Sequence, residues 1–237
     1  MNLILIDPGE IQDSRVLLTD QRARHIRKIL RSQVGDHLRL GIIGGSLGQG
    51  LVLHLDRDTV LLELHCSTPP PAKAATDLIL ALPRPIMLNR VLAQATAMGV
   101  GRIMLINAER VEKSFWQSSQ LRTERLQAAL WQGLAQAMDT QPPVLTLHRR
   151  FRPFVEDELP PLTTHYPRRL LAHPAPAVTA ADAPAPGRQL LTIGPEGGWR
   201  DSEITAFTSQ GFQFFSLGPR ILRVDTAVPA LLAAAGR

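Results

Sequence analysis

The chain reads Leu190-Leu-Thr-Ile-Gly-Pro-Glu-Gly-Gly-Trp199 and, a little further on, Phe212-Gln-Phe-Phe-Ser-Leu-Gly-Pro-Arg-Ile-Leu-Arg223. In each stretch a short apolar run, typical of a buried strand, leads into Gly-Pro. Asp201 or Ser202 can cap a helix that follows the first stretch and runs through Ile204. Two strands that each feed a helix bring both Gly-Pro loops to the carboxyl edge of a parallel sheet, where open α/β folds bind ligands.

The same pattern extends back along the chain to about residue 77. Strands alternate with helices there, which favours an α/β domain whose parallel sheet is covered on both faces. Leu126, Leu130, Leu134 and Met138 recur every four residues, so we expect this face of a long helix to pack on the sheet. Pro229 fits the last helix if that helix begins near Thr226, which places the proline in the first turn. We expect strands at 77–82, 102–107, 144–147, 168–172, 189–193 and 211–217, helices at 89–98, 120–138 and 226–235, and a Pro/Ala-rich surface loop at 175–187.

Residues 1–68 predict a different, β-rich module around one basic helix at 25–32. Its strands at 38–43 and 51–55 are joined by Gly44-Gly-Ser-Leu-Gly-Gln-Gly50. The stretch Thr68-Pro-Pro-Pro-Ala72 then ends regular structure, because consecutive prolines lack backbone donors and favour an extended linker. We therefore expect a small domain at 1–68, a linker at 69–76 and the α/β domain at 77–237.

The composition places the chain among globular proteins. Its 237 residues are 44% apolar, enough to bury a core without covalent staples. The single cysteine, Cys66, excludes a disulfide framework and a cysteine-rich zinc site and suits a reducing compartment. No window approaches the roughly 18 apolar residues of a membrane span, and the first residues lack the basic region of a secretory leader. We expect a cytoplasmic protein that does not enter a membrane.

Positive charge is concentrated near the N-terminus. The formal net charge is +5, and seven basic residues stand against two acids between Arg15 and Arg39. Arginine dominates, and its flat guanidinium can chelate phosphate oxygens and stack on bases. A solvated helix face explains the charge run equally well. The candidates for RNA contact are Arg24, His25, Arg27, Lys28 and Arg31.

Several familiar motifs are excluded. Gly44–Gly48 matches G-x-S-x-G, but the segment that follows predicts a strand, whereas a nucleophile elbow needs a helix, so we expect a glycine-rich hairpin. No P-loop motif occurs, and no G-x-G-x-x-G follows a strand. The seven histidines show none of the spacings typical of metal sites, so no metal is expected.

The two Gly-Pro segments closely resemble the small-subunit rRNA uracil-N3 methyltransferase family of the SPOUT superfamily, the RsmE type. The strongest matches are Ile193–Gly198, Asp201–Ile204 and Leu217–Arg223, followed by Asp225-Thr226-Ala227 where the family usually has Glu-Thr-Ala. A weaker match at His25–Asp36 resembles the family's PUA-like RNA-binding domain. The resemblance spans nearly the whole chain.

This resemblance implies a C-terminal domain with a deep trefoil knot, an exception to the rule that folds are unknotted. It implies a homodimer that holds S-adenosylmethionine mainly through main-chain groups, and a uridine of small-subunit (16S) rRNA as methyl acceptor, turned out of its stack. The cofactor-binding residues it implies are Leu191, Gly194, Gly198, Leu217, Gly218, Ile221 and Leu222.

The expected chemistry needs little covalent machinery, because the methyl group arrives activated. The protein must align the acceptor nitrogen and help to remove its proton. Arg220 and Arg223 are candidates to stabilise negative charge on the uracil carbonyls, and Glu196 or Asp225 to orient them or accept the proton. Each of these charges could instead fix its own loop.

The chain departs from the family at four helix positions, where Gln94, Ala97, Ala135 and Asp139 replace charged residues of the family pattern. The resemblance places those charges toward RNA, a partner or the cleft. Cofactor binding is therefore better supported than the RNA target. Two alternatives stay open, a paralogue that methylates another RNA position and a non-catalytic RNA-binding or ribosome-assembly protein.

Overall fold

The computed structural model describes residues 3–174 and 187–236. The expected surface loop at 175–187 lies outside this range except for its last residue. The chain divides into two compact units. The first comprises Met1–Ala72 with Leu134–Pro142, and the second comprises Lys73–Gly133 with Pro143–Arg237.

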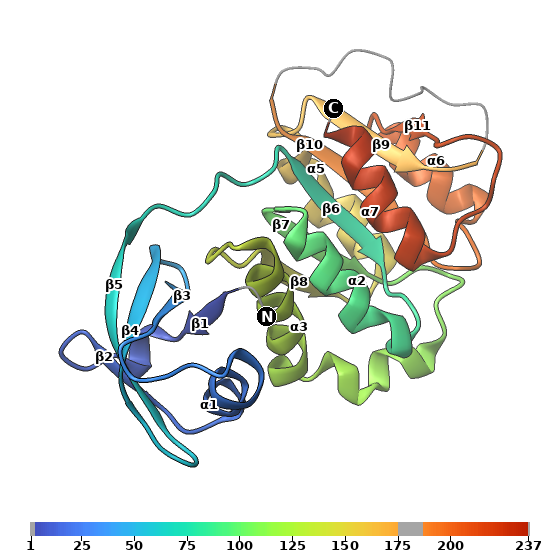
Figure 1. The fold of residues 1–237 in the computed structure, drawn as a ribbon. Coiled ribbons are helices and arrows are strands. Elements are labelled where there is room, and N and C mark those ends of the chain that lie inside the picture. The colour runs from blue at the N-terminus through green and yellow to red at the C-terminus, as the bar shows by residue number, and fades with distance from the viewer. Residues whose placement is uncertain (1–2, 175–186, 237) are drawn as a thin grey trace. The chain divides into compact units, whose positions relative to one another are not determined.

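The first unit is built on a five-stranded sheet in the order β1-β3-β4-β5-β2 (Figure 1). Only β1 and β3 pair in parallel; the other neighbours are antiparallel. In β2 and in the first part of β3 exposed and buried residues alternate, so one face of the sheet forms the core of this unit. The elements are β1 (Ile4–Ile6), η1 (Pro8–Glu10), β2 (Arg15–Leu18), α1 (Gln21–His25), the π-helical η2 (Ile26–Leu30), β3 (His37–Ile42), β4 (Leu47–Leu55) and β5 (Val60–Thr68).

The glycine-rich segment forms the expected hairpin, but β4 begins at Leu47, earlier than predicted. Gly48 and Gly50 are therefore strand residues, and both lie where a side chain does not fit. A Cβ on Gly48 would meet the His65 carbonyl oxygen at 2.0 Å, and one on Gly50 would meet the Leu40 side chain at 2.3 Å. Glycine is required at both positions because the neighbouring atoms leave no room for a side chain. A prediction from residue propensity alone assigns such glycines to a loop.

The second unit contains a six-stranded sheet in which all neighbours are parallel, in the order β11-β9-β10-β6-β7-β8. Every residue of β6 and β10 is buried, as expected for central strands covered on both faces. Figure 1 shows α2 and α7 in front of this sheet and α5 behind it. The strands are β6 (Thr76–Ala81), β7 (Arg102–Ile106), β8 (Val144–His148), β9 (Arg168–Ala172), β10 (Gln189–Ile193) and β11 (Gln213–Phe215).

The helices of this region confirm the predicted alternation, with three corrections. They are α2 (Pro85–Ala97), η3 (Lys113–Gln117), η4 (Ser119–Leu121), α3 (Thr123–Ala137), α4 (Phe151–Pro153), η5 (Phe154–Glu158), α5 (Leu159–Thr163), α6 (Asp201–Ser209) and α7 (Val224–Ala235).

The first correction concerns the apolar face of α3. Leu126 and Leu130 belong to the core of the second unit, but Leu134 groups with the first unit. Met138 lies beyond the end of α3 and has a φ of 56°. The four-residue spacing therefore does not describe one surface packed on one sheet.

The other corrections concern helix starts. α7 begins at Val224, so Pro229 lies in its second turn and leaves the Asp225 carbonyl without its usual helical donor. The N-cap residue of α6 is Arg200, and Asp201 is its first helical residue. The cap is supplied by Glu203, whose Oε2 accepts the main-chain N–H of Arg200 at 2.8 Å.

Candidate active site

The two Gly-Pro loops meet at one cavity of about 360 Å³ beyond the carboxyl ends of β9, β10 and β11. This size falls within the range of small-molecule sites. Its lining comprises Arg110 after β7, Ala172–Pro174 at the end of β9, Ile193–Trp199, Phe215–Gly218, Arg220–Leu222, and Val224, Ala227 and Leu231 of α7. The expected meeting of the two loops at the sheet edge is confirmed.

The first loop, residues 194–200, is shaped by a close contact between glycine and tryptophan. A Cβ on Gly194 would lie 2.9 Å from Trp199 Nε1. Trp199 is 5% exposed and packs edge-on against Phe207 with ring centroids 5.2 Å apart. Gly198 has a φ of +74°, and its N–H donates to the Pro195 carbonyl at 2.8 Å. The loop is thus a preformed turn whose inner wall is the indole ring.

The second loop, residues 216–223, turns at Gly218, which has a φ of +111° and donates its N–H to Ser216 Oγ at 3.1 Å. The side chains of Leu217, Ile221 and Leu222 are exposed, and Ile221 reaches 88%. Within the described chain, none of the main-chain N–H groups of residues 220–223 donates a hydrogen bond. The loop therefore offers apolar side chains and free main-chain donors to a ligand.

Six of the seven residues expected to bind cofactor line the cavity, and Leu191 does not. Leu191 lies in the middle of β10, fully buried between Leu170 of β9 and Leu78 of β6. Its side chain forms part of the core.

The four residues expected to be catalytic occupy different surroundings. Glu196 and Arg220 line the cavity and are exposed. Glu196 Oε1 also accepts the main-chain N–H of Arg84 at 3.1 Å, at the start of α2. Arg223 and Asp225 lie just beyond the lining residues. The Arg223 side chain is 82% exposed, whereas that of Asp225 is 15% exposed.

Asp225 is held by its neighbours in the first turn of α7. Its Oδ2 lies 3.3 Å from Arg90 Nη1 of α2, and its Oδ1 lies 3.9 Å from Arg223 Nε. That Oδ1 is buried and accepts no hydrogen bond within the described residues. A carboxylate at a helix N-terminus is favoured by the helix dipole, so the position of Asp225 has a structural explanation.

Sequence patterns did not identify two residues of the cavity wall, Arg110 and His173. Arg110 follows β7, and its Nη1 donates to the Gly197 carbonyl at 2.5 Å. His173 follows β9, and its ring lies 5.1 Å from that of Phe214. Both follow strands of a parallel sheet, so the carboxyl-edge rule could have identified them once the strand order was known.

The basic surface of the first unit is formed by α1 and η2. Arg24, Lys28 and Arg31 are exposed, and Arg27 is half-buried. His25 differs from these cations, because its Nε2 is buried without a hydrogen-bond partner among the described residues. Burial lowers the pKa of His25, so this side chain is uncharged at neutral pH.

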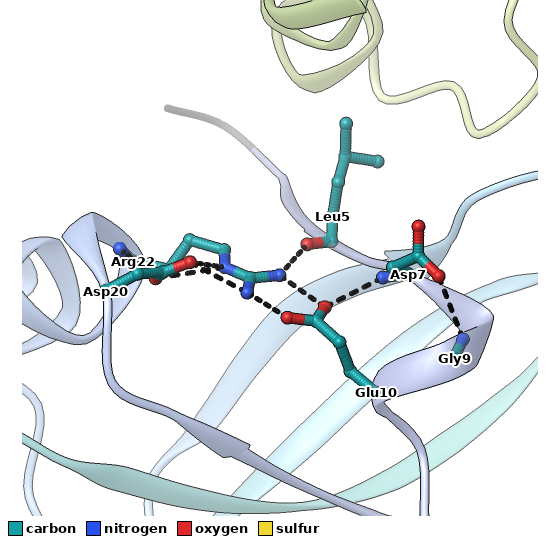
Figure 2. Close-up of polar contacts among 6 residues, drawn as sticks. All are labelled: Leu5, Asp7, Gly9, Glu10, Asp20 and Arg22. Atoms are coloured by element: carbon teal, nitrogen blue, oxygen red, sulfur yellow. Dashed lines mark hydrogen bonds and ion pairs between the residues drawn. The ribbon is translucent and has the colours of Figure 1, made fainter. Parts of the chain in front are cut away.

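Arg22, counted in the same charge run, is committed to the fold (Figure 2). Its Nη1 donates to the Leu5 carbonyl at 2.9 Å and to Glu10 Oε2 at 2.8 Å, and its Nε donates to both carboxylate oxygens of Asp20. Arg22 therefore joins β1, η1 and the start of α1. Counting charges along the sequence therefore overestimated the number of cations that are free to contact a polyanion.

Two of the positions that differ from the family pattern are buried. Ala135 is 6% exposed and Asp139 is 3% exposed, and both lie in the first unit. Gln94 of α2 has a buried Oε1 that accepts no hydrogen bond among the described residues. In this chain the first two positions do not form part of an exposed charged surface.

A search of residues 3–174 and 187–236 finds no group of three histidine, cysteine or acidic residues able to hold a metal ion. The helices of these residues include none with the length and apolar character needed to cross a membrane.

Comparison with known proteins identifies the family. Residues 70–236 match the model of the RNA methyltransferase domain, and residues 18–64 match that of the RNA methyltransferase PUA domain. The chain belongs to the RNA methyltransferase domain family. The family model covers the whole six-stranded sheet and both Gly-Pro loops.

Relatives extend the match over nearly the full chain. It is 29% identical to the ribosomal RNA small subunit methyltransferase E of Treponema pallidum, over 98% of this chain and 90% of the relative. The protein of the same name from Synechocystis is 28% identical over 97% of this chain and 75% of its own length. The crystal structure of the Neisseria gonorrhoeae enzyme of this name, bound to S-adenosyl methionine, superposes with a TM-score of 0.79 at 25% identity, covering 99% and 96% of the two chains. The expected fold class, an α/β methyltransferase domain after a small β-rich PUA domain, is confirmed.

Proposed function

We propose that this member of the RNA methyltransferase family transfers the methyl group of S-adenosylmethionine to N3 of a uridine in small-subunit rRNA. The observation that carries the proposal is the single cavity formed by the two Gly-Pro loops, in a chain whose full-length relatives are named for this class of reaction. An rRNA substrate also implies the cytoplasm as the site of action.

The cavity fits the cofactor in three respects. Its wall is apolar over Ile193, Trp199, Phe215 and Leu231, which suits an adenine ring. The free N–H groups of residues 220–223 can serve the polar edge of the base and the ribose. The glycines at 194, 198 and 218 leave the main chain uncovered by side chains. When bound, S-adenosylmethionine supplies an activated methyl group on a sulfonium.

Charged residues at the cavity can carry out the remaining steps, which are to orient the uracil and to remove its proton. Arg220 lines the cavity and can stabilise negative charge on the uracil carbonyl oxygens as the imide proton leaves. Glu196 lines the same cavity with an exposed carboxylate, which suits a proton acceptor or an orienting group. Asp225 and Arg223 do not line the cavity, so we assign them to holding the start of α7 and its preceding loop. Gly194, Gly198, Leu217, Gly218, Ile221 and Leu222 form the cofactor cradle.

RNA contact is assigned to the exposed Arg24, Lys28 and Arg31 and to the half-buried Arg27, which lie on α1, on η2 and directly after η2. Exposed Ile29, Leu30 and Val34 lie among them and can pack against bases. His25 enters this surface as an uncharged side chain. The domains proposed for these two roles are 1–68 and 77–237, joined by 69–76.

The proposal includes a homodimer and a trefoil knot in the second unit. The dimer is proposed because the family resemblance implies one, and a partner would cover exposed apolar side chains such as Ile86 and Ile221, which are 85% and 88% exposed. The knot is proposed from the family resemblance of the two Gly-Pro segments. Light scattering on the purified protein measures the oligomeric state directly, and a monomer at micromolar concentration would contradict the dimer.

Two alternatives make different predictions. A non-catalytic RNA-binding protein would not bind S-adenosylmethionine in calorimetry, whereas both enzyme hypotheses require binding. A paralogue that modifies another position would bind the cofactor but place the methyl group elsewhere. The paralogue hypothesis rests on the altered charge pattern at Gln94, Ala97, Ala135 and Asp139. Mapping the methylated nucleoside separates these hypotheses.

A further inference from the structure

A buried carboxylate lies behind the cofactor cradle. Glu203, in the first turn of α6, is 3% exposed. Its Oε2 accepts the N–H of Arg200 at 2.8 Å, and its Oε1 accepts the N–H of Glu109 at 2.8 Å. Arg200 ends the loop that follows β10, and Glu109 lies in the loop that follows β7. One side chain therefore joins two loops that both reach the cavity.

Helix capping explains only half of this arrangement. A glutamate at the third helical position commonly accepts the N–H of the N-cap residue, as Oε2 does here. The contact of Oε1 with Glu109 spans 94 positions of sequence and serves no helix. A second role is needed to account for it.

The residue next to Glu109 reaches the cradle directly. Arg110 Nη1 donates to the Gly197 carbonyl, and its side chain lines the cavity. A further ion pair, between Arg200 Nε and Glu109 Oε1 at 3.3 Å, is half-exposed and adds little on its own. The loop after β7 is thus linked to the cradle at two points, by the buried Glu203 and by the exposed Arg110.

We propose that Glu203 is a positioning residue for the cofactor cradle: by accepting one N–H from each loop, it fixes the loop at 194–200 against the loop at 107–111. It touches neither substrate nor cofactor, and the inference rests on the proposed function. The physical reason is the low exposure of the carboxylate. A buried acceptor that loses its donor, or a buried N–H that loses its acceptor, is strongly unfavourable, so the two loops stay in one arrangement.

The informative variant is Glu203→Gln. The amide keeps one acceptor oxygen, but its NH2 group must face one of the two N–H donors, so one loop is released. We expect the Kd and the KM for S-adenosylmethionine to rise about 10-fold, with kcat at saturating cofactor changed less than about 3-fold, because the loss is one of cradle geometry.

The matched control lies at the opposite, amino edge of the same sheet. Asp77 is 2% exposed and accepts hydrogen bonds from Tyr166 Oη at 2.6 Å and from Nε and Nη2 of Arg188. Tyr166→Phe removes one hydrogen bond from this buried carboxylate, as Glu203→Gln removes one from the other. It should lower Tm to a similar degree and leave the KM for the cofactor unchanged.

Calorimetry, steady-state kinetics and thermal unfolding are measured on the full-length wild type and both variants. If Glu203→Gln lowers Tm like Tyr166→Phe but leaves Kd and KM within about twofold of wild type, the positioning role is wrong. If Glu203→Gln does not fold, Glu203→Asp takes its place, because its side chain is one methylene shorter and cannot accept from both loops at once. It should raise KM several-fold with kcat at saturating cofactor changed less than about 3-fold, and an unchanged KM would overturn the inference. If the wild type itself binds no S-adenosylmethionine, the proposed function fails instead.

Discussion

Gly198→Ala tests whether the cradle must be preformed. Gly198 has a φ of +74°, and among the described residues a Cβ there would have only Arg110 Nη1 within 4 Å, at 3.6 Å. The substitution therefore strains the backbone and causes no steric clash with these residues. Gly44, in the β3–β4 hairpin of the first unit, has the same φ of +74°, and no described atom lies within 4 Å of a Cβ placed there. Gly44→Ala is the matched control.

The magnitude follows from the left-handed conformation. The left-handed conformation is about 1–2 kcal/mol less favourable for a residue with a side chain than for glycine. If the loop of the free variant relaxes to another conformation to relieve this strain, cofactor binding must return the loop to the strained conformation. At about 1.4 kcal/mol per tenfold change, affinity for S-adenosylmethionine should fall by about 5- to 30-fold. Gly44→Ala carries the same strain outside the cavity and should leave affinity unchanged.

Calorimetric titration of both variants with S-adenosylmethionine measures the effect, and thermal unfolding checks that their stabilities fall comparably. Equal affinity in wild type and Gly198→Ala would show that the loop's conformation does not control binding. A loss of affinity in Gly44→Ala as large as in Gly198→Ala would show that the effect is global. Either result would refute the reasoning.

Three further predictions concern charge. Arg31→Ala should weaken RNA binding and reduce the slope of log K against log salt by about 1, without changing cofactor affinity, as filter binding at several salt concentrations would show; an unchanged slope would remove Arg31 from the RNA surface. Arg220→Met should lower kcat by about 100-fold with little change in cofactor Kd in single-turnover assays, and an unaltered kcat would exclude its charge from the reaction. The hydrogen bonds from Arg22 lower the pKa of Glu10. The ionised carboxylate therefore stabilises the first unit at every pH above the ordinary pKa of a carboxyl group, and this stabilisation is lost as the pH falls through the lowered pKa. Arg22→Met should therefore cost about 2 kcal/mol at pH 7 and less near pH 3 in denaturant titrations, and a loss independent of pH would contradict the pairing.

Local pattern predicted the second unit well, because its central strands are buried on both faces and are mostly apolar. Residues 189–193 and 168–172 were predicted with the bounds that the structure has. The meeting of the two Gly-Pro loops followed from the sheet being parallel. These features depend on neighbours in sequence and on one topological rule.

The remainder depends on contacts between distant residues. Gly48 and Gly50 were assigned to a loop because their need for space beside His65 and Leu40 is visible only in three dimensions. Arg22 was counted as a free cation because its partner Glu10 lies outside the charge run. Glu203 was recognised only as part of a motif, since the contact with Glu109 spans both loops.

The central claim is tested most directly by locating the transferred methyl group. Small ribosomal subunits from a strain that lacks the N3 modification are incubated with the protein and S-adenosylmethionine carrying a labelled methyl group, and the rRNA is digested to nucleosides for mass spectrometry. The account predicts label in 3-methyluridine. Label in any other nucleoside would contradict uridine N3 as the target, and no label with cofactor bound would contradict the proposed activity on this substrate.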